Sequence, residues 1–174
     1  MDHLAEALRE RGLELTDDPG RMLERYSAYE MEPDRGEDAD LRMDVFAGVT
    51  LCVPLINSYL QGDSELMDYF HQDGAVPGFF YYPLDGFADA KERGKAVLDF
   101  RDKLEAGVLE RAGEDAVTFL GGASGIDYGY LDLIAWDLRK VLDAAVEVLE
   151  DLPVQWAAFH PFRREVGGVT LKAE

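Results

Sequence analysis

Runs of β-type residues alternate with runs of helical spacing along this chain, and that alternation restricts the fold more than any other feature of the sequence. The clearest helical run covers 138–149, where apolar residues recur at intervals of three and four. The runs on either side of it, 128–136 and 154–160, are rich in aromatic and branched residues and predict strands. Helices and strands of this kind bury their apolar faces against one another, so we expect an α+β fold.

The remaining elements can be placed by the same patterns and by the turn residues between them. We expect helices at 4–12, 63–70 and 87–112 as well as 138–149, and strands at 22–31, 41–53, 79–82, 116–120, 128–136, 154–160 and 166–172. The glycine-rich run 121–125 has no lysine and no following helix, as a phosphate loop would require, so we interpret it as a hairpin turn. The expected core comprises Val45, Val49, Leu51, Phe80, Phe119, Leu133, Leu142, Val146, Trp156 and Ala158.

The predicted fold class is a mixed or antiparallel sheet packed by helices on one side, within a single α+β domain spanning 1–174. Segments 22–85 and 115–172 share an order of elements, and each has a strand that ends before a proline, at Tyr82-Pro83 and His160-Pro161. This similarity suggests two tandem ββαβ-like units joined by the long helix 87–112. The alternative is that the same order arose by chance, as it commonly does in α+β proteins.

The charge of the chain restricts its partners. Acidic residues outnumber basic ones by 36 to 17, which gives a net charge of −19. Such a field repels phosphate backbones and anionic headgroups and attracts basic surfaces. We therefore expect no nucleic acid and no membrane as partner, and favour a basic protein. Solubility alone, or adaptation to a salt-rich habitat, are alternatives that explain the acidity without any partner.

The lone cysteine and the first residues of the chain indicate the cellular compartment in which the protein is expected. Cys52 has no second cysteine with which to form an internal disulfide, which favours a reducing compartment. The first residues lack the basic and apolar regions of a secretory signal, and no apolar run approaches the roughly 18 residues of a membrane span. We expect a cytoplasmic protein.

Catalytic chemistry finds little support in the sequence. His3, His71 and His160 are too scattered to form a recognisable metal site. Asp132 and Asp137 lie an odd number of positions apart, so on a regular strand they face opposite sides, and Asp137 is better explained as the N-cap of the following helix. We expect no metal and no cofactor, and favour a non-enzymatic protein over an enzyme.

The candidate binding residues are aromatic or basic: Tyr82, Tyr130, His160, Arg163 and Arg164. Aromatic rings next to guanidinium groups suit an anionic organic ligand, and adjacent arginines can bind a carboxylate or phosphate by two hydrogen bonds each. A simpler interpretation is also open. His160 would then be a satisfied, partly buried histidine, and the two arginines would form intramolecular ion pairs.

Two functions remain as hypotheses. The first is a non-enzymatic acidic binding or regulatory protein that recognises a basic protein surface, as an inhibitor or immunity-type antagonist of a nuclease or toxin would. The second is a small-molecule binder or enzyme with an aromatic and Arg-lined pocket between the two halves, near Tyr82, Tyr130, His160 and Arg163.

Overall fold

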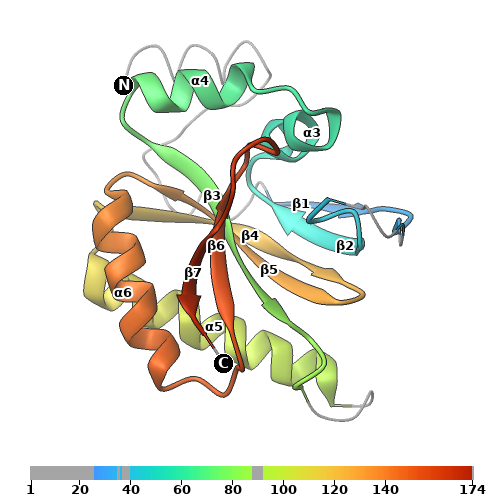
Figure 1. The fold of residues 1–174 in the computed structure, drawn as a ribbon, viewed down its shortest axis with the longest axis vertical. Helices are drawn as coiled ribbons and strands as arrows, with labels where there is room; N and C mark the ends of the chain where they lie inside the picture. The colour runs from blue at the N-terminus through green and yellow to red at the C-terminus, as the bar shows by residue number, and fades with distance from the viewer. Residues whose placement is uncertain (1–25, 35, 37–39, 88–91, 174) are drawn as a thin grey trace.

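The computed structural model describes residues 26–34, 36, 40–87 and 92–173 (Figure 1). The strands are β1 (Ser27–Glu30), β2 (Val45–Thr50), β3 (Val76–Pro83), β4 (Val117–Gly125), β5 (Tyr128–Ala135), β6 (Ala157–Pro161) and β7 (Val169–Lys172). The helices are α3 (Val53–Gln61), α4 (Glu65–Gln72), α5 (Arg93–Ala112) and α6 (Leu138–Glu150). The helix expected at 4–12, and the start of the strand expected at 22–31, lie outside the described residues.

The described strands form one seven-stranded antiparallel sheet in the order β1-β2-β4-β5-β3-β6-β7. Helices α5 and α6 pack on one face and α3 and α4 on the other (Figure 1). The α+β class is therefore confirmed, whereas the expectation that helices pack on one side is wrong. The reason lies in the inner strand β3, whose large aromatic side chains point alternately to the two faces, so that both faces need a cover.

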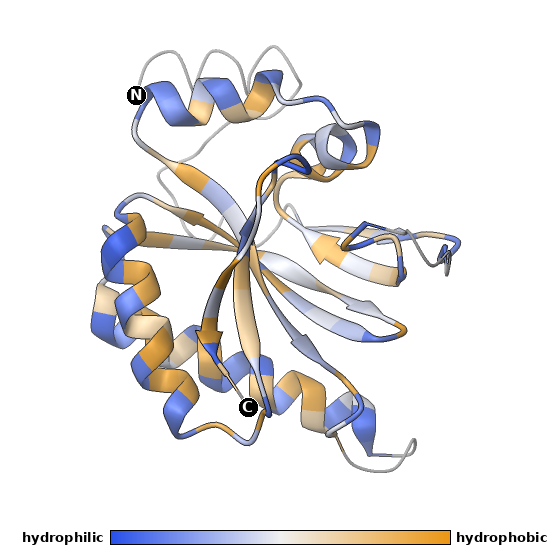
Figure 2. Cartoon of the chain, viewed as in Figure 1, coloured by the Kyte–Doolittle hydropathy of each residue, from blue (hydrophilic) through white to orange (hydrophobic). Residues whose placement is uncertain are grey.

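The larger core lies between the sheet and helices α5 and α6. Hydrophobic and hydrophilic residues alternate in bands along both helices (Figure 2). From β3 and β5, Phe80 and Leu133 enter this core fully buried. The two helices approach closely at Gly107, where an added Cβ would lie 2.8 Å from Val148. Burial of each large apolar side chain stabilises the fold by about 1.5–3 kcal/mol, so this layer fixes the position of α5.

The second core lies under α3 and α4 and is built around aromatic rings. Phe79 of β3 packs edge-on against Tyr59 of α3, with ring centroids 5.7 Å apart. From α4, Leu66 and Phe70 complete the packing with no exposed surface. Helix α3 was not expected, because the strand predicted over 41–53 runs into its first turn.

The turn expected at 121–125 is also wrong, because β4 continues through this segment and turns only at 126–127. The glycines serve close approach between strands. Gly121 has φ 131°, and a Cβ there would lie 2.2 Å from the carbonyl oxygen of Val49 on β2. A second glycine, Gly122, lies beneath the guanidinium of Arg101. These positions let β2 pair with β4 and bring the side chain of Arg101 down onto the sheet.

The strand order does not confirm two tandem units. Strand β3 of the first half is separated from β2 by both β4 and β5, whereas β6 of the second half is separated from β5 by one strand. Helices α3 and α4 also lie on the face opposite α6. The strands of both halves instead interleave in one sheet.

The ten expected core residues are confirmed only in part, because four are buried, five are partly buried and one is exposed. Val45, Phe80, Leu133 and Ala158 are buried, and among the ten only Val49 is strongly exposed, at 42%. Within the described part of the chain, no helix has both the length and the apolar character needed to cross a membrane.

Candidate functional site

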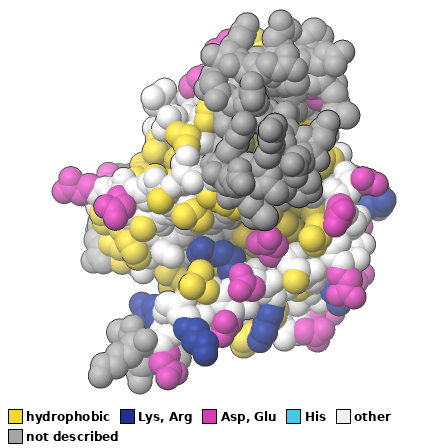
Figure 3. All heavy atoms as spheres, turned by 180° about the vertical axis from the view of Figure 1, so that it is seen from behind, with side chains coloured by type: hydrophobic (Ala, Val, Ile, Leu, Met, Phe, Trp, Pro, Cys, Tyr) yellow, Lys and Arg dark blue, Asp and Glu magenta, His cyan; other side chains and the backbone are white. Residues whose placement is uncertain are grey.

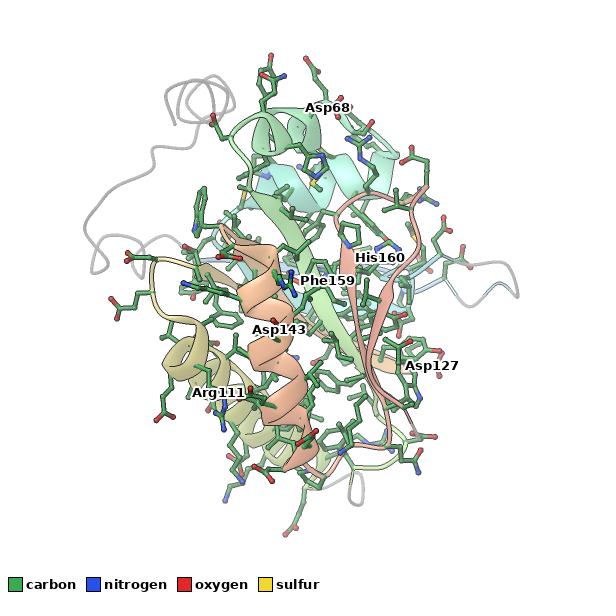
Figure 4. All side chains as sticks on the ribbon, turned by 60° about the vertical axis from the view of Figure 1, so that its left-hand side comes forward. Asp68, Arg111, Asp127, Asp143, Phe159 and His160 are labelled. Atoms are coloured by element: carbon green, nitrogen blue, oxygen red, sulfur yellow. The ribbon has the colours of Figure 1, made fainter. Side chains whose placement is uncertain are left out.

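The sheet separates the aromatic candidates from one another. Tyr82 points into the α5 side, where its ring centroid lies 4.4 Å from that of Phe100. On the opposite face, Tyr130 and His160 both pack against Phe79, and the histidine ring is stacked on it with centroids 5.4 Å apart. In Figure 4, His160 follows Phe159 on β6, and the alternation of the strand sends their side chains to opposite faces. Tyr82 therefore shares no pocket with Tyr130 and His160.

Arg163 and Arg164 form ion pairs within the chain. The guanidinium of Arg163 binds the carboxylate of Asp68 on α4, and that of Arg164 binds Asp40. In addition, Arg164 donates a hydrogen bond from Nη1 to the carbonyl oxygen of Leu60, at 3.2 Å. These contacts fasten the segment after β6 to α3 and α4, which is the simpler of the two interpretations that the sequence allowed.

Arg42 was not among the residues predicted from sequence, yet it is 2% exposed and lies at the centre of a buried polar network. Its guanidinium binds both carboxylate oxygens of Asp132, at 2.6 and 3.2 Å, and donates a third hydrogen bond to the hydroxyl of Tyr29 at 2.9 Å. Three aromatic rings surround the cation, those of Phe79, Tyr130 and Phe162, with centroids 4.9–5.1 Å from its central carbon. Charge, hydrogen bonds and ring contacts together satisfy this cation.

The network continues from Arg42 to the turn between β4 and β5. The backbone N–H of Arg42 donates to the hydroxyl of Tyr130, which in turn donates to Asp44 Oδ1 at 2.5 Å. The other oxygen of Asp44 accepts from the N–H groups of Asp127 and Tyr128, at 3.0 and 3.1 Å. All of these groups have partners, so the network is best explained as a structural anchor for segment 40–44.

Burial and the fixed partners shift the pKa values in the network. Burial alone would lower the pKa of Arg42, but the charge and hydrogen bonds of Asp132 together with Tyr29 and Tyr130 outweigh burial, and the pKa is raised. The pKa of Tyr130 is raised by burial and by its hydrogen bond to Asp44. Arginine and tyrosine thus keep their protons near neutrality. Among the described residues, no group of three or more potential ligands could hold a metal ion.

An open groove of about 560 Å³ lies beside the first turns of α5. Its apolar walls come from β2, from the segment after β3, from α5 and from the β4–β5 turn. The lining residues are Phe46, Leu84, Arg93, Gly94, Val97, Leu98, Ser124, Gly125 and Ile126. Two of them are unusually exposed for large apolar residues, Phe46 at 47% and Leu98 at 55%. None of the five predicted binding residues lines this groove.

The groove continues into an acidic surface along the same helix. Leu98, Asp102 and Glu105 lie at i, i+4 and i+7, so they share one flank of α5. Gly107 points the other way, towards Val148 of α6. The flank therefore faces the β1–β2 end of the sheet, where Tyr26 and Val49 are also exposed. We call this surface the flank patch: Tyr26, Phe46, Val49, Leu98, Asp102 and Glu105.

Among the described neighbours, Arg101 only partly offsets the acidic groups of the flank patch. The pKa of Glu105 is raised by partial burial and by the charge of Asp102, against a smaller opposite effect of Arg101. The pKa of Tyr26 is raised by burial and then by Glu105, which places the two side chains within electrostatic reach. No ion pair between described residues includes Asp102 or Glu105.

Seen from behind, hydrophobic side chains lie interspersed with Asp and Glu, and Lys and Arg lie among them (Figure 3). A patch with exposed apolar side chains and charged side chains beside them has the usual make-up of a protein interface. The arrangement can bind a cation or a basic surface.

Comparisons with protein families, with curated proteins and with solved structures found no match for this chain. The geometry of the flank patch is therefore the evidence on which a function can be proposed.

Proposed function

We propose that this protein is a non-enzymatic, cytoplasmic binding protein that recognises a basic protein surface through the flank patch, as an inhibitor or immunity-type antagonist would. The single observation that carries the proposal is the position of Glu105. This carboxylate is partly buried beside Asp102 and next to exposed apolar side chains, and its pKa is raised as a result.

The raised pKa means that ionisation of Glu105 is less favourable in the folded protein than in a fully exposed glutamate. A lysine or arginine placed against Glu105 and Asp102 would reverse that effect, because an opposite charge within about 4–6 Å favours ionisation. The favourable interaction of these two carboxylates with a lysine or arginine would therefore be gained when the partner binds. The net charge of −19 would also attract a basic partner at long range and speed the encounter.

The alternative of a small-molecule pocket near Tyr82, Tyr130, His160 and Arg163 has no comparable support. Tyr82 faces α5 while Tyr130 and His160 face α3, and Arg163 is paired with Asp68.

The proposal can be tested with the double variant Asp102→Asn/Glu105→Gln and a fluorescent lysine-rich peptide as the probe. We expect affinity measured by fluorescence polarisation to fall about fivefold, because two carboxylate contacts of modest strength are lost. Affinity of the unmodified protein should also fall steeply as salt rises, since exposed charges are screened.

The matched control is Asp99→Asn/Glu110→Gln, which removes the same charge from the exposed side of the same helix. It should change the affinity by less than twofold. Equal losses for the two double variants would show that only net charge matters, and the proposed site would then be rejected.

A further inference from the structure

We infer that the groove beside α5 accepts a large apolar side chain from the partner, and that the partner places a lysine or arginine against Asp102 and Glu105 in the same binding event. This inference rests on the proposed function and specifies the recognition element: one apolar anchor and one basic contact on a single protein segment.

The groove has the chemistry of an anchor site. Five of its lining residues are large and apolar, and its volume of about 560 Å³ suits one or two large side chains rather than a water molecule. Phe46 on β2 and Leu98 on α5 are about half exposed on its two sides. Water is displaced from both when an apolar side chain enters, which favours binding.

The distance between groove and acidic pair sets the spacing of the partner residues. Leu98 borders the groove, and Glu105 follows seven residues later on the same helix, which corresponds to about 10 Å along the axis. An extended segment spans that distance in about three residues and a helix in about seven. The partner segment should therefore carry its apolar and basic side chains at one of these spacings.

Charge decides between possible occupants. A second copy of this chain would bring its own net charge of −19 against the acidic pair, and a free organic anion would meet the same field. Arg93 at one end of the groove provides a single cation against that field. A segment with a basic side chain beside an apolar one is attracted by both parts of the surface, as in interfaces with an apolar centre and a charged rim.

Filling the groove tests the inference without disturbing the fold. Gly94 lines the groove in the first turn of α5, and a Cβ added there meets no atom of the described residues within 4 Å. Gly94→Trp should fill the groove, while Gly94→Ala makes the same backbone change and leaves it open. The probes are two lysine-rich peptides of equal charge, one with a central tryptophan and the other with serine at that position.

We expect the tryptophan peptide to bind the unmodified protein about tenfold more tightly than the serine peptide, and to shift the NMR amide signals of Leu98 and Ile126. Gly94→Ala should keep that preference and Gly94→Trp should abolish it, leaving equal, salt-sensitive binding of both peptides. Equal binding of both peptides to the unmodified protein would overturn the inference while leaving the acidic site standing. Failure of both peptides to bind would overturn the proposed function itself, and self-association that Gly94→Trp removes would assign the groove to a second copy.

Discussion

Arg42 shows how one residue can tie together distant parts of this chain. It lies 90 residues before Asp132, its ion-pair partner, and has φ 72°, a left-handed backbone conformation that is uncommon outside glycine. The ion pair, the surrounding rings and the bond from its N–H to Tyr130 hold it there. These long-range contacts offset the energetic cost of the left-handed backbone conformation at Arg42.

Removing the cation should destabilise the protein strongly. Arg42→Met keeps most of the side-chain volume but leaves Asp132, which has no exposed surface, as an unpaired buried charge. We expect the free energy of unfolding in urea to fall by about 3–5 kcal/mol.

Two further variants separate loss of the pair from loss of packing. Arg42→Met/Asp132→Leu removes both charges and should recover part of the lost stability, since apolar replacements of buried pairs are often well tolerated. Arg139→Met breaks an exposed pair with Asp143 and should leave the stability unchanged. If Arg42→Met also unfolded at the same urea concentration as the unmodified protein, the network would carry no structural role.

No sequence pattern near Arg42 pointed to this role, because a single basic residue at the start of the strand expected at 41–53 gives no sign of being buried. The better signal was Asp132, a carboxylate between Leu131 and Leu133 in an otherwise apolar strand. A buried carboxylate requires a cation or several donors. That signal predicts that a partner exists but not which of the 17 basic residues it is.

Helix α6 illustrates what can be predicted at the level of an element. Its apolar spacing and its N-cap both come from neighbouring residues, and both are confirmed. Asp137 adopts an extended conformation before the first turn, and its Oδ1 accepts the N–H of Lys140 at 3.1 Å. One of the free N–H groups at the helix start is thereby satisfied.

Loss of this cap should be measurable. Asp137→Ala removes the acceptor, and we expect a loss of about 1 kcal/mol in the free energy of unfolding. Asp137→Asn keeps a side-chain oxygen in the same place and should retain most of the stability. Thermal unfolding of the two variants side by side decides the matter: if Asn proves as damaging as Ala, the carboxylate charge and not the hydrogen bond is what α6 requires.

The sequence-based predictions of α3 and of the end of β4 were wrong because long-range packing outweighed the local residue pattern. For α3, proline in the first turn and Gly62 after the last were valid helix signals, but the preceding β-rich residues favoured extending the strand. For β4, glycines that usually mark a turn serve the close approach of β2. The flank patch was missed for a related reason: Leu98 and Glu105 become a surface only once α6 covers the other side of α5.

At the scale of the whole molecule, the dominant property is the net charge of −19. Like charges on a compact surface repel one another, and that repulsion opposes folding. Acidic side chains of α5 contribute to it directly, because Asp102 lies next to Glu105 and raises its pKa. A basic partner would reduce this repulsion, so the protein should be more stable in the complex than alone. The binding proposal is thereby linked to the stability of the free protein.

The pH dependence of stability tests that link. Glu105 has a pKa raised above its ordinary value of 4.5, so the folded state holds this proton more tightly than the unfolded state does. Its contribution to stability is present below pH 4.5 and is lost as the pH rises through the folded-state pKa. Glu105→Gln cannot ionise and should therefore be more stable than the unmodified protein at pH 7, with the difference shrinking as the pH falls towards 4.

Urea unfolding across this range measures the effect, with Glu110→Gln on the exposed side of α5 as the control. If the stability difference between Glu105→Gln and the unmodified protein stayed constant with pH, the pKa of Glu105 would not be raised in the folded state. The main support for the flank patch as a binding site would then be lost.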